Sequence, residues 1–173
     1  MWHIYKIGSK NWLETANQLA TQSSSNAGGN FPVKGYDGND KTYFSSKSPR
    51  TSAQWWQLDF ERLFAVTEIE LTIGVRFLNY FKKIDIRLIP SLKESQDTKA
   101  DRTKWPLCAK FETWKQLQKS DRHVANANVF RIKCNANSSS VIGRYIRVTM
   151  AKQSRIGSAL VFNEINFFGQ YVG

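Results

Sequence analysis

The sequence contains few of the residue types that build catalytic or metal centres. Only two cysteines, Cys108 and Cys134, and two histidines, His3 and His123, occur in 173 residues. The cysteines form no CxxC pair, so thiolate metal sites and dithiol redox centres lack their spacing, and the two either pair or remain core thiols. No Ser-His-Asp or Cys-His set can be assembled around the histidines, and no carboxylate pair for glycoside hydrolysis stands out. The sequence therefore predicts that the protein is not an enzyme.

Long apolar runs are also missing. No stretch approaches the roughly 20 apolar residues that a membrane-spanning helix needs. The N-terminal stretch MWHIYKIGSKNWLE lacks the apolar region and cleavage site of a signal peptide, so the chain as given is expected to be soluble. A mature secreted chain would look the same. The sequon Asn137-Ser138-Ser139 fits a surface loop of a secreted protein, although such triplets also arise by chance.

Apolar and aromatic residues are plentiful. They make up 41% and 13% of the chain, more than a disordered chain carries, and the length fits one domain over residues 1–173 with a substantial core. The net charge of +11 favours anionic partners such as nucleic acid, acidic glycans or anionic lipid. The charges are spread along the chain without a block of five or more, so a solvated surface explains them equally well.

Period-two alternation dominates the chain. In QWWQLDF, Trp56, Leu58 and Phe60 share one face, and VTEIELTIGV alternates in the same way. The segments KKIDIRLI, NVFRIKC, GRYIRVTM and FNEINFFG repeat the pattern between turn formers. We therefore expect an all-β fold, an antiparallel β-sandwich or jelly roll. Helical spacing is confined to Asn11–Ala20, which fits a short N-terminal helix, and the charged stretch Ser91–Lys104 is expected to be an exposed loop.

The stretch GYDGNDKTYF, Gly35–Phe44, concentrates turn formers and oxygen donors in one bend. Gly35 and Gly38 allow unusual backbone dihedrals, while Asp37 offers a carboxylate and Thr42 a hydroxyl. Ca²⁺ takes about six to eight oxygen ligands, including the main-chain carbonyls that tight turns supply. The bend fits a calcium site, and it also fits an ordinary Asp-Gly turn between strands.

Five motifs follow one another in a characteristic order. A Ser-rich start leads into the Gly35–Phe44 bend, and QWWQLDF, VTEIEL, GRYIRVTM and FNEINFFG come after it. In this order they resemble the discoidin (coagulation factor type C) superfamily, and within it the F-type lectins (fucolectins), over about Leu19 to Gly169. The resemblance implies a galactose-binding-like jelly roll of about eight main strands.

The resemblance also implies that the bend is a structural Ca²⁺ site. The implied ligands all carry oxygen atoms at the bend or on the last strand: Lys34, Asp37, Asn39, Thr42, Asn163 and Glu164. Glu164 lies among aromatic residues, with Phe162 and Phe168 expected on its strand face, and a carboxylate there needs a metal or a paired cation. A salt bridge to Arg144 or Arg147 is the alternative to the metal.

The cysteines fit the same family. F-type lectins commonly pair a cysteine that follows the central strands with one just before the Gly-Arg-Tyr strand, and Cys134 precedes Gly143-Arg144-Tyr145. The resemblance therefore implies a Cys108–Cys134 disulfide, which favours an extracellular, secreted location.

The fucose site of the family is not reproduced. F-type lectins that bind fucose use a histidine from the loop after the calcium turn and an Arg-x-Asp after the central strand, whereas GVRFLNYFKK has Arg76 without that aspartate. We therefore expect a ligand other than simple fucose. The candidate ligand-binding residues are basic, amide and aromatic side chains of the loops at the expected binding end: Lys47, Arg50, Arg76, Phe77, Asn79, Tyr80 and Lys82.

These observations favour a calcium-stabilised, carbohydrate-binding, lectin-like recognition module. Its partner would be a glycan or glycoconjugate, and an oligomer would add avidity to weak sites. The alternative is a membrane-surface or adhesion module that binds anionic phospholipid or acidic glycans, with Phe77 and Leu78 inserting as apolar wedges. A nucleic-acid partner is not expected, because the sequence has no recognition-module motif and no basic helix.

Overall fold

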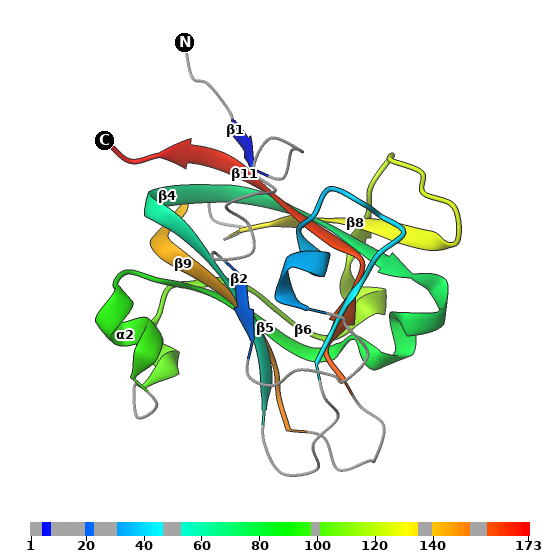
Figure 1. Ribbon diagram of the computed structural model, residues 1–173, viewed down its shortest axis with the longest axis horizontal. Helices are drawn as coiled ribbons and strands as arrows, with labels where there is room; N and C mark the ends of the chain where they lie inside the picture. Colours follow the sequence, from blue (N-terminus) through cyan, green and yellow to red (C-terminus); the bar gives the residue numbers. More distant parts are fainter. Residues whose placement is uncertain are drawn as a thin grey trace.

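The structure is a computed structural model that describes residues 5–7, 20–22, 31–46, 53–97, 101–134, 140–152 and 159–173. Within these residues the chain forms eleven strands and five short helical segments (Figure 1). The strands are β1 (Tyr5–Ile7), β2 (Ala20–Gln22), β3 (Phe44–Ser45), β4 (Gln54–Gly74), β5 (Lys82–Ile89), β6 (Leu107–Thr113), β7 (Gln118–Lys119), β8 (Ala127–Lys133), β9 (Val141–Met150), β10 (Val161–Phe162) and β11 (Glu164–Tyr171). The helical segments are η2 (Pro32–Gly35), η3 (Val75–Tyr80), α2 (Leu92–Gln96), η4 (Arg102–Lys104) and η5 (Trp114–Gln116). The helix expected over Asn11–Ala20 lies outside the described residues, apart from Ala20, which begins β2.

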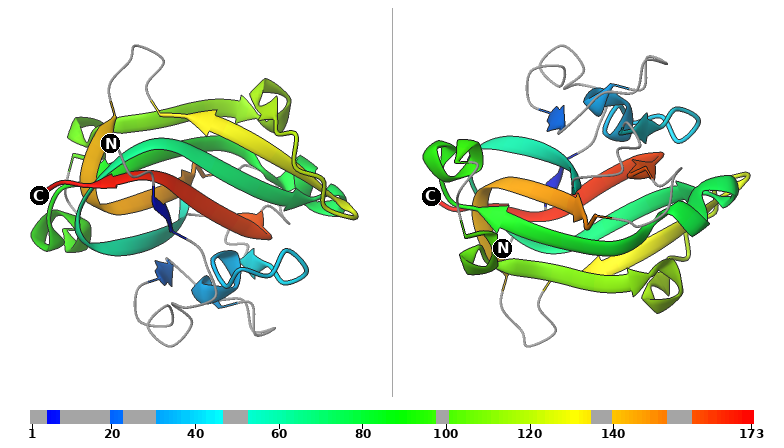
Figure 2. Two further views of the ribbon diagram at one scale, coloured as in Figure 1. Left: turned by 90° about the horizontal axis from the view of Figure 1, so that it is seen from above. Right: turned by 90° about the horizontal axis from the view of Figure 1, so that it is seen from below.

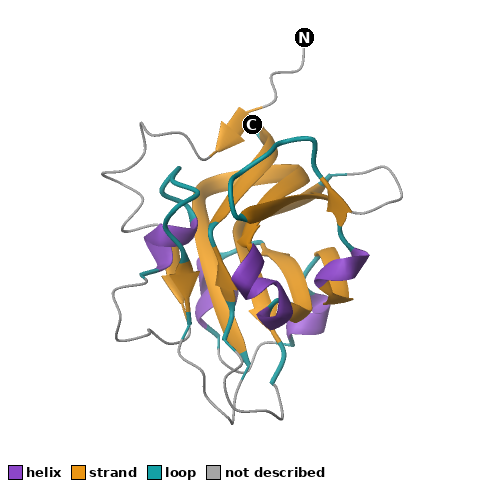
Figure 3. Cartoon of the chain, turned by 90° about the vertical axis from the view of Figure 1, so that its right-hand side faces the viewer, coloured by secondary structure: helices purple, strands orange, loops and turns teal. Residues whose placement is uncertain are grey.

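Nine of these strands form one antiparallel sheet that curls around a core. The hydrogen-bonded order is β1-β11-β4-β9-β5-β6, with β2 and β8 also paired to β4 and β7 paired to β8, while β3 and β10 pair separately. Figure 2 shows the sheet bent back on itself, and Figure 3 shows the short helical segments at the periphery of the strands. The predicted all-β, antiparallel jelly roll is confirmed, with its layers joined in a continuous sheet.

The 21-residue strand β4 joins the layers. Its first half pairs with β2 and β9, and its second half pairs with β8 and β11. The pairing with β9 shifts between Asp59 and Phe64, and Glu61 has a φ of 66°. Asp59 accepts a hydrogen bond from the Glu61 N–H at 2.7 Å and also binds the Arg144 guanidinium, which holds the bend in place. The segments QWWQLDF and VTEIELTIGV are therefore one bent strand.

Aromatic side chains fill the inside of the curl. Trp56 meets the Phe162 ring edge-to-face at 5.5 Å and stacks on Phe167 at 6.4 Å. The predicted common face of Trp56, Leu58 and Phe60 is confirmed, since none of the three is more than 3% exposed. Aromatic pairs of this kind contribute about 0.5–1.5 kcal/mol each beyond the area that they bury. The core therefore holds the bent strand β4 against the last strands of the chain.

The stretch Ser91–Lys104, expected to be an exposed loop, is partly helical. The Ser91 side chain caps α2 by accepting a hydrogen bond from the Glu94 N–H at 3.3 Å, and η4 ends just before Trp105. The Trp105 indole N–H donates to Glu94 at 3.1 Å. A small cluster on the outer face of the sheet buries this tryptophan: Ile89, Trp105 and Tyr145. The expectation of an exposed loop was wrong because Trp105, which follows the charged stretch, packs against the sheet and holds the stretch close to it.

The two cysteines are joined. A disulfide links Cys108 on β6 to Cys134 at the end of β8, across 26 residues of sequence. In the chain-entropy model, closing a loop of this length stabilises the folded state by about 3 kcal/mol. The disulfide that the resemblance implied is therefore confirmed.

Candidate metal site and adjoining cavity

A tight bend between η2 and β3 presents several oxygen atoms to one another. Gly35 allows the bend to pack closely, because a Cβ there would lie 2.5 Å from Phe162 Cε2. Gly38 adopts a φ of 73°, a conformation that residues with a side chain rarely take. The two glycines seen in the sequence therefore serve different purposes, one for packing and one for the turn.

The Thr42 hydroxyl lies at the centre of these oxygens. Its Oγ1 is 2.9 and 2.8 Å from the two carboxylate oxygens of Asp37, 2.9 Å from the Asn39 carbonyl oxygen and 3.4 Å from the Lys34 carbonyl oxygen. A hydroxyl has one proton and can donate it in one direction at a time. Most of these oxygens therefore lie against the hydroxyl oxygen without a proton between the two atoms, an arrangement that a cation would stabilise.

Glu164 reaches the same bend from the start of β11. The Gly38 N–H lies 3.2 Å from each of its carboxylate oxygens, and the residue is only 2% exposed. Burial, reinforced by the negative charge of Asp37, raises the pKa of Glu164 to about 8. The alternative salt bridges are wrong, because Arg144 pairs with Asp59 and Arg147 donates to Gln57 and to the Ser95 carbonyl oxygen.

The strand face expected around Glu164 is also different. The chain bends at Asn163, between β10 and β11, and this bend resets the alternation of side chains. Phe162 consequently lies in the core with Ile165 and Phe167. Glu164 is thus separated from Phe162 and turned toward the bend.

The donor set fits Ca²⁺. Two carboxylates, two main-chain carbonyls and a hydroxyl are hard oxygen ligands of the type that this ion prefers, and the excess of negative charge suits a divalent cation. The described residues contain no group of three or more His, Cys, Asp or Glu side chains that could hold a metal, so the fit depends on the main-chain carbonyls. The Lys34 ammonium lies 3.6 Å from Asp37 and competes for it, but its side chain is 40% exposed and can turn into water.

The Asn163 side chain does not point to the oxygen cluster. Its Oδ1 accepts a hydrogen bond from the Gly74 N–H at 2.6 Å, and its Nδ2 donates to the Asp40 carbonyl oxygen at 2.9 Å. Asn163 therefore ties the bend to the end of β4. As a side chain it positions the candidate metal site and is not one of its oxygen donors.

An arginine that sequence reasoning missed braces the far side of the bend. Arg122 binds both carboxylate oxygens of Asp40, at 2.9 and 3.1 Å, and donates to the Thr72 hydroxyl at 2.8 Å. Its Nε lies 2.9 Å from Glu70 Oε1, close enough for an ion pair but not aligned for a hydrogen bond. The hydrogen bond to Asp40 is the main reason why the pKa of Arg122 is raised. No local pattern around residue 122 signals this role, because its partners lie on β4 and in the bend.

A cavity of about 910 Å³ adjoins the bend. Its walls come from the bend itself, from η3 and from the segment between β7 and β8. The polar and aromatic side chains that line it are Asn39, Asp40, Lys41, Arg76, Phe77, Arg122, His123, Asn126 and Asn163. In the sequence, His123 lies far from the loop that follows the bend. The fold nevertheless brings it to the same cavity as Arg76.

The predicted ligand-binding residues are only partly brought together. Arg76 and Phe77 line the cavity, and the Arg76 guanidinium stacks 4.5 Å from the centre of the Phe77 ring. The same ring lies 4.8 Å from that of Tyr43, so Phe77 supports Arg76 and is less open to a ligand than expected. The remaining predicted residues of this region, which do not line the cavity, are Asn79, Tyr80 and Lys82. Two others lie outside the described residues: Lys47 and Arg50.

Comparison with known proteins finds similar structures but no similar curated sequence or family model. No family model matches the chain, and no curated protein matches it. An F-type lectin (fucolectin) from the serum of striped bass, Morone saxatilis, matches with a TM-score of 0.65 and 19% identity over 89% of this chain and 46% of that one. The lectin domain of lectinolysin, in complex with Lewis b antigen, matches with a TM-score of 0.59 and 18% identity over 90% and 95%. The family 32 carbohydrate-binding module of NanJ from C. perfringens, in complex with galactose, gives 0.57 and 17% over 96% and 99%.

These similarities define the class of fold. The chain has the galactose-binding-like jelly roll that F-type lectins and family 32 carbohydrate-binding modules share, as the sequence motifs predicted. It spans 46% of the length of the striped bass lectin chain and nearly the full length of the bacterial modules.

Proposed function

We propose that the protein is a calcium-stabilised carbohydrate-binding module of the lectin type. Two features support this function: a fold shared with proteins solved in complex with Lewis b antigen and galactose, and a bend whose oxygens suit Ca²⁺. When bound, the ion would neutralise the facing carboxylates of Asp37 and Glu164. It would thereby fix one wall of the adjoining cavity.

The glycan would bind in the cavity between the bend and η3. The observation that carries this proposal is the convergence of Arg76, His123 and Asn126, from separate segments, on one cavity. Sugar hydroxyls are recognised by planar side chains that donate or accept in fixed directions. Arg76 can donate, while His123 and Asn126 can each donate and accept. The ligand would differ from simple fucose, since the Arg-x-Asp of fucose binders is missing after Arg76.

The protein would act by binding and outside the cell. The Cys108–Cys134 disulfide is typical of oxidising compartments. In the part of the chain that the structure describes, no helix has the length and apolar character to cross a membrane. A catalytic role is not proposed.

A membrane-surface module is the second candidate. The expectation that Leu78 inserts as an apolar wedge is wrong, because this residue is 7% exposed and lies in the core. On the same segment, η3, Val75 and Tyr80 are exposed by 57% and 41%. Apolar side chains beside a cation can insert into an anionic lipid surface. In contrast to a lectin, such a module would show no selectivity among sugars.

A glycan array read with and without Ca²⁺ tests the proposal, with liposome sedimentation as the parallel measurement. If the protein is a lectin, we expect binding to a limited set of glycans and loss of that binding in EDTA. Arg76→Ala should lower the affinity for these glycans by about tenfold or more, because one charge-assisted contact is worth about 1.5–3 kcal/mol. Lys119→Ala, an exposed lysine on β7, is the matched control and should bind normally. Binding to anionic liposomes without any selectivity for a glycan would overturn the lectin reading in favour of the second candidate.

A further inference from the structure

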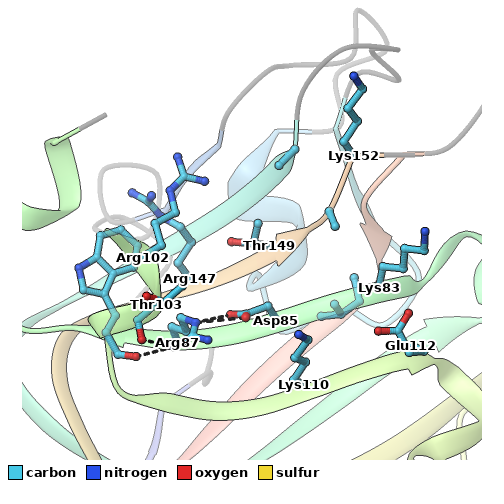
Figure 4. A pocket seen from close by; sticks show the side chains of 14 residues that line it. Lys83, Asp85, Arg87, Arg102, Thr103, Lys110, Glu112, Arg147, Thr149 and Lys152 are labelled. Carbon is cyan, nitrogen blue, oxygen red and sulfur yellow. Dashed lines mark hydrogen bonds and ion pairs between the residues drawn. The ribbon is translucent and has the colours of Figure 1, made fainter. Parts of the chain in front are cut away.

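A second hollow lies on the outer face of the sheet, away from the bend. It has a volume of about 530 Å³ and lies over β5, β6 and β9 (Figure 4). One wall is formed by η4 and Trp105, the segment that the small outer cluster fastens to the sheet. Its lining includes three short side chains, Ala53, Thr149 and Ala151. Short side chains beside longer ones leave a depression in the surface.

Arg147 is buried in this wall, and no residue that the structure describes gives it an anionic partner. Its residue is 3% exposed, and its guanidinium stacks between the rings of Trp55 and Trp105, 4.4 and 5.1 Å from their centres. Its Nε donates to Gln57 Oε1 at 2.9 Å and its Nη2 to the Ser95 carbonyl oxygen at 2.7 Å, and both acceptors are neutral. None of the ion pairs between described residues includes Arg147.

A buried charge without a counter-charge is costly, and proteins normally pair such groups. Burial and the nearby Arg102 lower the pKa of Arg147 to about 10, so the guanidinium still carries its proton at neutral pH. The charge is thus kept in the folded protein. An anion delivered from outside would supply the missing partner.

More cations surround the hollow. The basic residues among its lining are Lys83, Arg87, Arg102, Lys110, Arg147 and Lys152, against two acidic ones, Asp85 and Glu112. Asp85 is already paired with Arg87 at 2.8 Å. Figure 4 shows the lysines and Arg102 around the rim, with Thr149 between them. The hollow therefore carries an excess of positive charge, with the hydroxyl of Thr149 among the cations (Figure 4).

A neighbouring hollow adjoins the first at Arg147. This neighbouring hollow of about 440 Å³ shares Arg102 and Arg147 with the first and extends over Trp55, Gln57 and Tyr145. It adds two carboxylates, Asp59 and Asp97, and no further cation, so the anionic groups of a ligand belong over the first hollow. At about 530 Å³ the first hollow is larger than a single small anion and suits an oligomer with repeated anionic groups.

The surroundings distinguish among the anionic polymers. None of the large exposed apolar residues of the described chain lines the first hollow, so it has no side chain to insert into a lipid layer. Its one aromatic residue, Trp105, is 3% exposed and offers no open face for a base to stack on. Sulfates and carboxylates fit the planar fork of arginine, and sugar hydroxyls can bond to Thr149 and Asp85.

We propose that this outer face binds an acidic oligosaccharide, one that carries sulfate or uronate groups, on the cations of its rim, with Arg147 in the wall beside them. This site is separate from the cavity beside the bend and does not depend on Ca²⁺. The protein would then hold two glycan surfaces of different chemistry on one module.

The test measures binding of a size-defined heparin hexasaccharide by calorimetry, in EDTA, beside a neutral hexasaccharide, a single-stranded DNA oligonucleotide and phosphatidylserine vesicles. The triple variant Arg102→Ala/Lys110→Ala/Lys152→Ala removes three charges from the rim. The matched control, Lys115→Ala/Lys119→Ala/Lys133→Ala, removes three exposed charges from η5, β7 and β8. We expect the rim variant to weaken heparin binding by tenfold or more and the control by less than about threefold. The neutral sugar should not bind.

Several results would overturn the proposal. Equal losses of heparin affinity in the two triple variants would indicate unspecific attraction by net charge. Tighter binding of DNA or of vesicles than of heparin would also contradict the proposal, as would the absence of any heparin binding. Arg76→Ala separates this site from the one under "Proposed function". That variant should bind heparin normally, whatever it does to the glycans found on the array. A loss of heparin binding in Arg76→Ala would show that the acidic sugar binds in the cavity beside the bend and not on the outer face.

Discussion

Glu164 and Gly38 meet across 126 residues of sequence: the Gly38 N–H lies 3.2 Å from both carboxylate oxygens of Glu164. This contact joins the bend near the start of the described chain to its last long strand. Because the carboxylate is 2% exposed and faces Asp37, the contact also creates a concentration of negative charge. The proposed Ca²⁺ is the simplest means of compensating it.

The first prediction concerns the metal. In wild type, Ca²⁺ should raise the melting temperature and EDTA should lower it, since a ligand at about 100 times its dissociation constant stabilises the folded state by about 2.7 kcal/mol. Asp37→Ala and Glu164→Ala should each lower the melting temperature and remove its response to EDTA. Asp101→Ala, an exposed carboxylate in the loop before η4, is the control and should keep the response. A wild-type melting curve that EDTA leaves unmoved would show the calcium assignment to be wrong.

The second prediction is a pH dependence of the metal-free protein. The pKa of Glu164 is about 8 in the folded state against an ordinary value of 4.5, so the folded chain holds a proton that the unfolded chain releases between these values. Stability in EDTA should therefore fall as the pH rises from about 4.5 to 8, by an amount on the order of a few kcal/mol. Urea unfolding at several pH values measures it.

Glu164→Gln supplies the control for this pH dependence. The amide cannot ionise, so the decline between pH 4.5 and 8 should flatten in this variant. Wild type with saturating Ca²⁺ should also show a flatter profile, because the bound cation compensates the carboxylate charge. A decline of equal size in Glu164→Gln would assign the effect to another group.

The third prediction concerns Asn163 as a positioning residue. Asn163→Ala leaves the Gly74 N–H and the Asp40 carbonyl without their partner, and each buried polar group left unpaired costs about 1–3 kcal/mol. We expect a lower free energy of unfolding together with weaker Ca²⁺ binding, read by calorimetry. Gln118→Ala, exposed on β7, should change neither quantity. Unchanged Ca²⁺ affinity in Asn163→Ala would limit the role of this residue to stability.

The fourth prediction concerns the disulfide. Thiol titration of the unreduced, denatured protein should find no free thiol, because Cys108 and Cys134 are paired. The double variant Cys108→Ala/Cys134→Ala should lose about 3 kcal/mol of stability in denaturant unfolding. Two titratable thiols in the unreduced protein would argue against both the bridge and the extracellular location.

Local patterns were reliable guides where a residue's neighbours in sequence decide its environment. Alternation in β5 and β9 predicted these strands because side chains on a strand point to opposite faces in turn. The expectation failed at Phe162, because the bend at Asn163 interrupts the alternation and a single asparagine within an alternating run is a weak turn signal. It failed again at Ser91–Lys104, which is held by Trp105 and its partners on β5 and β9.

The sequence by itself determined that this protein is an all-β jelly roll and that its bend between residues 35 and 44 gathers oxygen donors. Both depend on strand periodicity and turn chemistry, which are short-range. Only the tertiary structure decided that His123 shares a cavity with Arg76, and that Arg147 stacks against two tryptophans while no described residue supplies its counter-charge. These relationships join residues far apart in the chain, and they arise from the way in which one bent strand, β4, brings its neighbours together.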